Sequence, residues 1–131
     1  MTDRRPARVY GVLRRGDRVF LRSTAGGLGL PGGAFRPLAE DRKVELRAHI
    51  HDQLGVEAKN IWAQGAFAYR DACEAEEAFC GFYTVWDWDG GVPGGAGRWL
   101  DKDEVADEPG LPPSLSILLL SILDTVALKT R

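Results

Sequence analysis

The chain has 131 residues, two cysteines and a formal net charge of −2. Its length predicts one domain over residues 1–131, and hydrophobic and charged fractions of 44% and 27% are ordinary for a globular protein. The small net charge argues against binding to a nucleic acid polymer, although residues 1–22 carry seven arginines against two aspartates.

Cysteine usage and hydropathy indicate a cytoplasmic protein. Cys73 and Cys80 are too few for a disulfide framework and indicate reduced thiols. Residues 1–6 are charged and are not followed by the apolar core of a secretory signal. The most apolar run, residues 115–123, is interrupted by two serines and is far shorter than the roughly 20 residues that span a bilayer. We therefore expect no membrane insertion.

The first third of the chain predicts a hairpin and a turn. Residues 8–13 and 18–22 are β-type runs joined by the Arg-Arg-Gly-Asp turn of residues 14–17. Residues 23–28 form a loop of mostly small residues. Residues 30–33, Leu-Pro-Gly-Gly, predict a sharp turn whose backbone can approach a ligand closely.

An amphipathic helix is expected next, ending at Gly55. Its apolar stripe recurs every four residues, at Leu46, Ile50 and Leu54. Titratable groups recur on a neighbouring face, at Glu45, His49 and Asp52. The helix is thus expected to pack on one side and to present polar groups beside it.

The second half predicts strands at residues 61–69, 78–88 and 97–100. Asp101 and Glu104 then have the spacing of a capping box. A closing helix follows, with an apolar stripe of Leu115, Leu118, Leu119, Ile122, Leu123 and Val126. Ile117 and Leu120 lie off this stripe, which predicts a homodimer through the helix; cover by a neighbouring loop is the alternative.

The turn and helix together resemble the Nudix hydrolase (MutT-like) family. The family's box reads Gly, five residues, Glu, seven residues, then Arg-Glu-aliphatic-any-Glu-Glu-any-Gly-aliphatic, commonly after Leu-Pro-Gly. The positions that match are Leu30, Pro31, Gly32, Gly33, Glu40, Ile50, Gly55 and Val56. The order of elements along the remaining chain is also similar. The resemblance implies an α/β Nudix fold with a mixed sheet sandwiched between helices.

The core of the box is degenerate. Ala48 replaces the family's Arg, His49 replaces a Glu, and Asp52 and Gln53 replace the Glu pair; the spacing from Gly33 to Glu40 is one residue too long. In the family the box glutamates bind a divalent metal, usually Mg²⁺, and the resemblance therefore implies Mg²⁺ or Mn²⁺ here. Magnesium prefers oxygen ligands, so imidazole and amide are poor substitutes.

Candidate roles follow from the resemblance, except that of Glu45, which is included because it lies one turn before His49 and could contribute a carboxylate there. Glu40, Glu45 and His49 are the candidate catalytic residues, Gly32 and Gly33 the substrate-binding residues, and Asp52, Gln53 and His49 the metal positions. His49 with Glu45 and Asp52 would alternatively suit a transition metal, and an ordinary solvent-facing histidine is the simpler interpretation.

Two functions of different classes remain open from the sequence. The first is a Nudix-like hydrolase of a nucleoside-diphosphate-linked or related compound, with weakened or atypical metal-dependent activity. The second is a catalytically inactive Nudix-fold module that binds a nucleotide-like ligand or a protein partner. The family resemblance favours the first, whereas loss of two of the three helix carboxylates favours the second on physical grounds.

Overall fold

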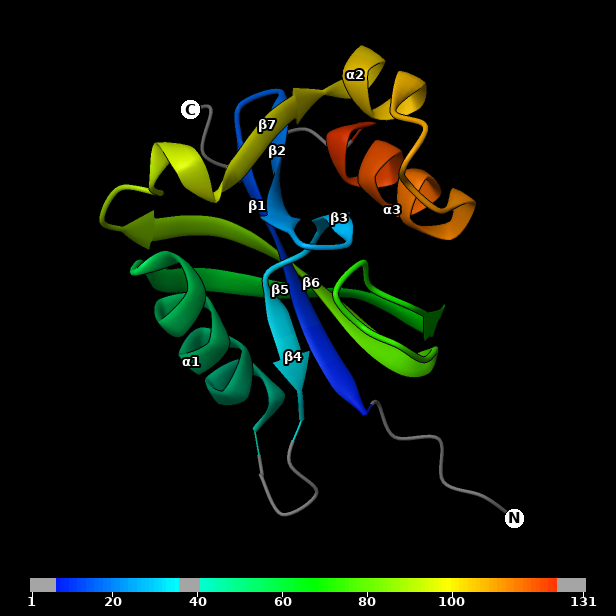
Figure 1. The fold of residues 1–131 in the computed structure, drawn as a ribbon. Helices are drawn as coiled ribbons and strands as arrows, with labels where there is room; N and C mark the ends of the chain where they lie inside the picture. The colour runs from blue at the N-terminus through cyan, green and yellow to red at the C-terminus, as the bar shows by residue number, and fades with distance from the viewer. Residues whose placement is uncertain (1–6, 36–40, 125–131) are drawn as a thin grey trace.

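A seven-stranded sheet forms the centre of the computed structural model, which describes residues 7–35 and 41–124 (Figure 1). The strands are β1 (Arg8–Arg15), β2 (Arg18–Thr24), β3 (Gly27–Gly29), β4 (Gly32–Ala34), β5 (Glu57–Tyr69), β6 (Ala78–Asp89) and β7 (Gly97–Asp101). The helices are α1 (Arg42–Leu54), α2 (Lys102–Asp107) and α3 (Pro113–Asp124), with a short 3₁₀ turn, η1 (Gly94–Ala96).

The sheet is mixed. Its main strand order is β3-β2-β1-β6-β5, with β4 paired to β1 and β7 paired to β2. The pairing of β1 with β6 is parallel, whereas the other pairings are antiparallel. The predicted hairpin is confirmed as β1 and β2, and β5 lies at one end of the sheet, where its described partner is β6 alone.

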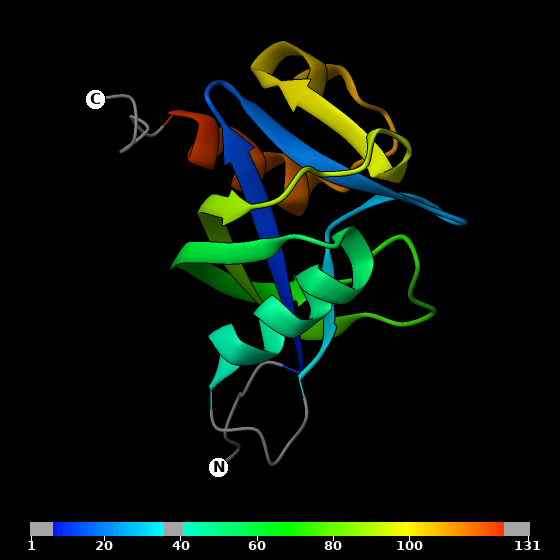
Figure 2. The same cartoon turned by 90° about the vertical axis from the view of Figure 1, so that its left-hand side faces the viewer.

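Two hydrophobic cores cover the two faces of the sheet. One core contains the buried face of α1, including Leu46, Ile50 and Leu54. The other contains Val105 of α2 and the leucines of α3. Figures 1 and 2 show α1 on one side of the sheet and α2 and α3 on the other. The predicted α/β arrangement of a mixed sheet between helices is therefore confirmed.

Three local expectations need correction. Residues 23–28, expected to be a loop, include the end of β2 and the start of β3, and residues 32–34 form β4 instead of a free turn. Strand β5 begins at Glu57, four positions before residue 61. These segments are extended because they pair with β1, β2 and β6, and such tertiary pairing leaves little mark on short or glycine-rich stretches.

Helix α3 buries most of its predicted stripe. Leu115, Leu119 and Ile122 are fully buried, and Leu120 packs against the same core. Ile117 is 69% exposed, so one apolar side chain of this helix faces solvent. Val126 lies outside the described residues. Within the part of the chain that the structure describes, no helix is long and apolar enough to span a membrane.

Candidate functional site

Helix α1 is capped at both ends by its own sequence. The Asp41 carboxylate accepts a hydrogen bond from the Lys43 amide at 2.8 Å, and Gly55 ends the helix in the left-handed conformation, with φ of 74°. The predicted end at Gly55 is confirmed. Glu40, a candidate catalytic residue, lies outside the described residues.

Strand β4 lies close against β1. At Gly32, where φ is 146°, a Cβ atom would be 2.1 Å from the Val9 carbonyl oxygen, so no other residue fits without a backbone shift. Gly32 pairs with Tyr10 and Gly33 with Val9 across the strands. Of the two glycines singled out as substrate-binding residues, Gly32 is therefore the one that allows this close pairing of strands.

The loop before β4 is anchored by a buried carboxylate. Asp71 is fully buried, and its Oδ1 accepts hydrogen bonds from the Leu30 amide at 3.0 Å and from the Tyr69 hydroxyl at 2.6 Å. Burial, and next the charge of Asp71, raise the pKa of Tyr69, so its hydroxyl remains a donor. Sequence analysis did not identify this anchor, because the Leu30 amide that it holds lies 41 residues away along the chain.

Gln53 joins α1 to β4 through a reciprocal pair of hydrogen bonds. The Gly32 amide donates to Gln53 Oε1 at 2.9 Å, and Gln53 Nε2 donates to the Gly32 carbonyl oxygen at 2.8 Å. An amide side chain suits this pairing because its NH₂ group donates and its oxygen accepts. Both backbone groups of Gly32 are thereby engaged, and the carbonyl faces an N–H group.

His49 makes the next contact between the same two elements. Its Nε2 lies 2.8 Å from the Ala34 carbonyl oxygen, which fits the tautomer that carries a proton on Nε2. The imidazole also covers Gly33, where an added Cβ would lie 3.0 Å from His49 Cε1. Together, His49 and Gln53 fasten α1 to β4.

The two carboxylates of α1 have different surroundings. Glu45 is buried, at 6% exposure, whereas the side chain of Asp52 is 82% exposed and lies 4.0 Å from His51 Nδ1. Among residues 7–35 and 41–124, no group of three or more His, Cys, Asp and Glu side chains is placed to hold a metal ion. The candidate metal and catalytic residues that the structure describes thus do not converge.

These residues do not fit Mg²⁺ or Mn²⁺. Such hard ions require several oxygen ligands in near-octahedral geometry. Here the Gly32 carbonyl accepts a hydrogen bond from an amide, the His49 imidazole bonds the Ala34 carbonyl, and Asp52 points to solvent. His49 and Gln53 thus form neutral hydrogen bonds at positions where a metal site would need charged oxygen ligands.

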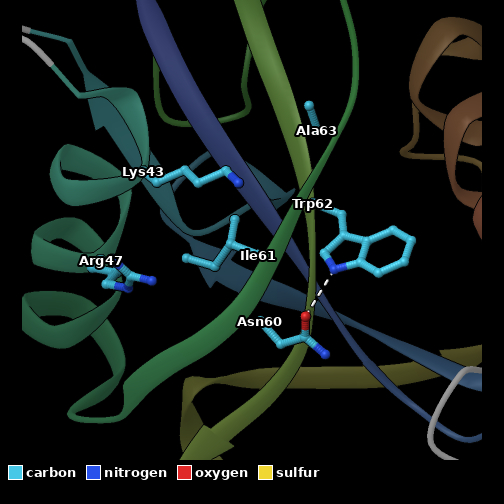
Figure 3. A pocket seen from close by; sticks show the side chains of 6 residues that line it. All are labelled: Lys43, Arg47, Asn60, Ile61, Trp62 and Ala63. Carbon is cyan, nitrogen blue, oxygen red and sulfur yellow. Dashed lines mark hydrogen bonds between the residues drawn. The ribbon is translucent and has the colours of Figure 1, made fainter.

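A pocket of about 590 Å³ lies between α1 and β5, on a part of α1 that does not include His49 or Gln53. Figure 3 shows the side chains of Lys43 and Arg47 extending from α1 towards β5. The pocket is lined by Lys43, Arg47, Asn60, Ile61, Trp62 and Ala63, and none of these is acidic. The sequence analysis did not predict this pocket. Two cations four residues apart on one helix repel each other, and such a pair is a sequence signal for a site that binds an anion.

Comparison with solved structures identifies the fold. The MutT protein from Bacillus halodurans matches with a TM-score of 0.70 and 19% identity, covering 90% of this chain and 82% of that one. The MutT NUDIX hydrolase from Burkholderia pseudomallei matches with a TM-score of 0.66 and 23% identity, covering 88% and 96%. The MutT protein from Methanosarcina mazei Go1 matches with a TM-score of 0.70 and 15% identity, covering 89% of this chain and 91% of that one.

At these identities the likeness shows the fold, which is that of MutT and Nudix hydrolases, as the box resemblance implied. The sequence itself matches no protein-family model and no curated protein to a significant degree.

Proposed function

We propose that this chain is a Nudix-fold module that binds a nucleotide-like phosphorylated compound without metal-dependent hydrolysis. The observation that carries the proposal is the reciprocal pairing of Gln53 with Gly32. A neutral amide there cannot neutralise a metal or bring it to a diphosphate, and charge neutralisation is the main source of catalysis in such reactions.

Ligand binding is supported by two features. One is the fold shared with MutT proteins over about nine-tenths of the chain. The other is the pocket beside α1, which offers Lys43 and Arg47 to an anion. A nucleotide-like compound is the ligand class that suits both features.

A hydrolase is the second candidate. It is supported by the same shared fold and by Asp52, whose exposed carboxylate is open to a ligand from solvent. In this version Glu40, Glu45 and Asp52 would supply oxygen ligands to Mg²⁺ or Mn²⁺ and water would be the nucleophile. The reaction would be cleavage of a diphosphate bond.

The test is incubation of the purified chain with a panel of nucleoside diphosphate derivatives and either metal, followed by chromatographic measurement of the nucleoside monophosphate formed. Thermal stabilisation by the same compounds, in EDTA and in metal, reports binding. The proposal expects stabilisation in EDTA and no turnover. Turnover that disappears in both Asp52→Ala and Glu40→Ala would establish the hydrolase instead.

We also propose a cytoplasmic location, on the basis of the free thiols Cys73 and Cys80.

A homodimer through α3 is a further proposal. It is supported by exposed Ile117, which lines a pocket of about 400 Å³ together with Phe67 and Leu118. Light scattering of wild type and Ile117→Glu tests it. A monomer mass for the wild type at all concentrations would rule the dimer out.

A further inference from the structure

We propose that the pocket between α1 and β5 is a phosphate site, in which Lys43 and Arg47 bind the phosphate groups of a phosphorylated small molecule without metal. The inference rests on the proposed function for the class of ligand, and it adds which part of the ligand this pocket holds and what each lining residue contributes. It also separates this site from the box residues, because His49 and Gln53 contact β4 whereas Lys43 and Arg47 face β5.

Lys43 is available to an anion. Within the described residues its side chain forms no hydrogen bond and no ion pair; only its backbone amide is engaged, by the Asp41 cap. Lys43 also lies in the first turn of a 13-residue helix, where the helix dipole favours negative charge. An anion at this position would therefore meet a free ammonium group and a favourable dipole.

Arg47 is held in place by one nitrogen and offers the others. Its Nε donates to the Ala58 carbonyl oxygen at 3.2 Å, which orients the guanidinium group between α1 and β5. In the part of the chain that the structure describes, no carboxylate is paired with its terminal nitrogens. Such a guanidinium group matches the oxygens of a phosphate by parallel hydrogen bonds.

Placing Lys43 and Arg47 four residues apart costs stability unless something relieves their repulsion. A bound anion between the two side chains would convert that repulsion into two attractions. None of the six residues lining the pocket supplies a negative charge of its own. The arrangement is therefore more favourable with an anionic ligand than without one.

The opposite wall contains an unusual backbone position. Asn60 is the one non-glycine residue with positive φ, 51°, among the described residues. Its Oδ1 accepts a hydrogen bond from Trp62 Nε1 at 2.7 Å, which leaves the amide NH₂ group as a donor (Figure 3). The left-handed backbone suits asparagine and places this residue on the wall of the pocket that faces α1.

Trp62 acts on the site through Asn60. Figure 3 shows the indole on the side of β5 away from Lys43 and Arg47, and its ring contacts Trp86 at a centroid distance of 6.2 Å. The ring therefore does not offer a stacking face beside the two cations. The pocket therefore offers charged groups and no stacking face to a ligand. We infer that it holds the phosphate groups of the ligand and does not hold a nucleobase.

The test is a titration of the ¹⁵N-labelled full chain with inorganic diphosphate and, separately, with ADP, both in EDTA. Binding should shift the amide signals of Lys43, Arg47 and Asn60 and the indole signal of Trp62. The Lys43→Ala/Arg47→Ala variant should bind at least about tenfold more weakly, since each cation contributes a charge-assisted hydrogen bond. Added salt should weaken wild-type binding.

The matched control is Arg18→Ala/Lys102→Ala, which removes the same two kinds of charge from exposed positions elsewhere. Lys43→Glu alone is a second probe, because this side chain forms no hydrogen bond or ion pair among the described residues and its replacement should leave the fold intact while weakening binding. Equal binding by the pocket variant and the control would overturn the phosphate site.

The failures of the two proposals are distinguishable. ADP binding with shifts confined to residues 32–34 and 49–53 would remove this site and leave the proposed function in place. Binding of inorganic diphosphate at the pocket without binding of any nucleotide would retain the site and remove the proposed function. Absence of binding by every probe would overturn both.

Discussion

Gln53 and Gly32 exchange two hydrogen bonds, at 2.8 and 2.9 Å, across a separation of 21 residues. Because both backbone groups of Gly32 are used, Gln53 fixes the distance and angle between α1 and β4. We expect Gln53→Ala to lower the free energy of unfolding by about 1–3 kcal/mol, measured by urea denaturation.

Asp52→Ala is the matched control for this change, since it alters the neighbouring residue of the same helix at an exposed position. Its effect should stay within about 0.5 kcal/mol. A Gln53→Ala variant as stable as Asp52→Ala would mean that the reciprocal pair does not support the fold.

Asp71 should be among the most sensitive polar positions. Asp71→Ala leaves the buried Leu30 amide and Tyr69 hydroxyl without their acceptor, and we expect a loss of about 2–4 kcal/mol in the free energy of unfolding. Asp71→Asn keeps the Oδ1 acceptor and should lose less. Equal losses in the two variants would contradict an anchoring role through this oxygen.

Arg14 connects β1 to the end of α3. Its guanidinium group donates to the carbonyl oxygens of Ile122 and Leu123, and its Nε donates to that of Gly16. Arg14→Met should therefore loosen α3, and in a hydrogen-exchange measurement the protection of the amides of residues 113–124 should fall more than that of the amides of α1. Uniform protection in both helices would show that Arg14 does not hold α3.

The two cysteines should differ in reactivity. Cys73 is exposed, whereas Cys80 is fully buried, and burial raises the pKa of the Cys80 thiol to about 11. A thiol reagent at neutral pH should modify Cys73 in the native protein and both cysteines after unfolding. Modification of Cys80 at the same rate as Cys73 would contradict the packing of β6.

Alkaline pH should destabilise the protein. The pKa of Cys80 is raised from 9.0 to about 11, and burial also raises the pKa of Tyr10 and Tyr69. For a group whose folded pKa is raised, the stabilisation is complete below the unfolded pKa and is lost as pH rises towards the folded value. Urea midpoints should therefore fall from about pH 9 upwards, and by less in Cys80→Ala. A constant midpoint would contradict this linkage.

Local signals predicted the features of the fold that depend on neighbours in sequence. Gly55 ended α1 as expected, and Asp101 and Glu104 formed the predicted capping box. Strands β3 and β4 were missed, because three-residue segments containing glycine are extended only through pairing with β2 and β1. Strand β5 began earlier than expected because residues 57–59 are likewise extended through pairing, in this case with β6.

The candidate site was less predictable. The box pattern drew attention to Gln53 and His49 as metal positions, but their actual contacts are with the backbone of Gly32 and Ala34. Such contacts follow from how α1 docks on β4, which the residues of α1 alone do not determine. Lys43 and Arg47 were not singled out from the sequence, because the wall opposite them is formed by β5, which follows in the chain.

We propose that neutral hydrogen bonds occupy the place of a metal site on α1. Calorimetric titration with Mn²⁺ distinguishes the two arrangements, using wild type, Asp52→Ala and a His49→Glu/Gln53→Glu variant that restores carboxylates. We expect no saturable Mn²⁺ binding by the wild type and a gain of binding in the double variant. Stoichiometric Mn²⁺ binding by the wild type that is lost in Asp52→Ala would contradict the claim.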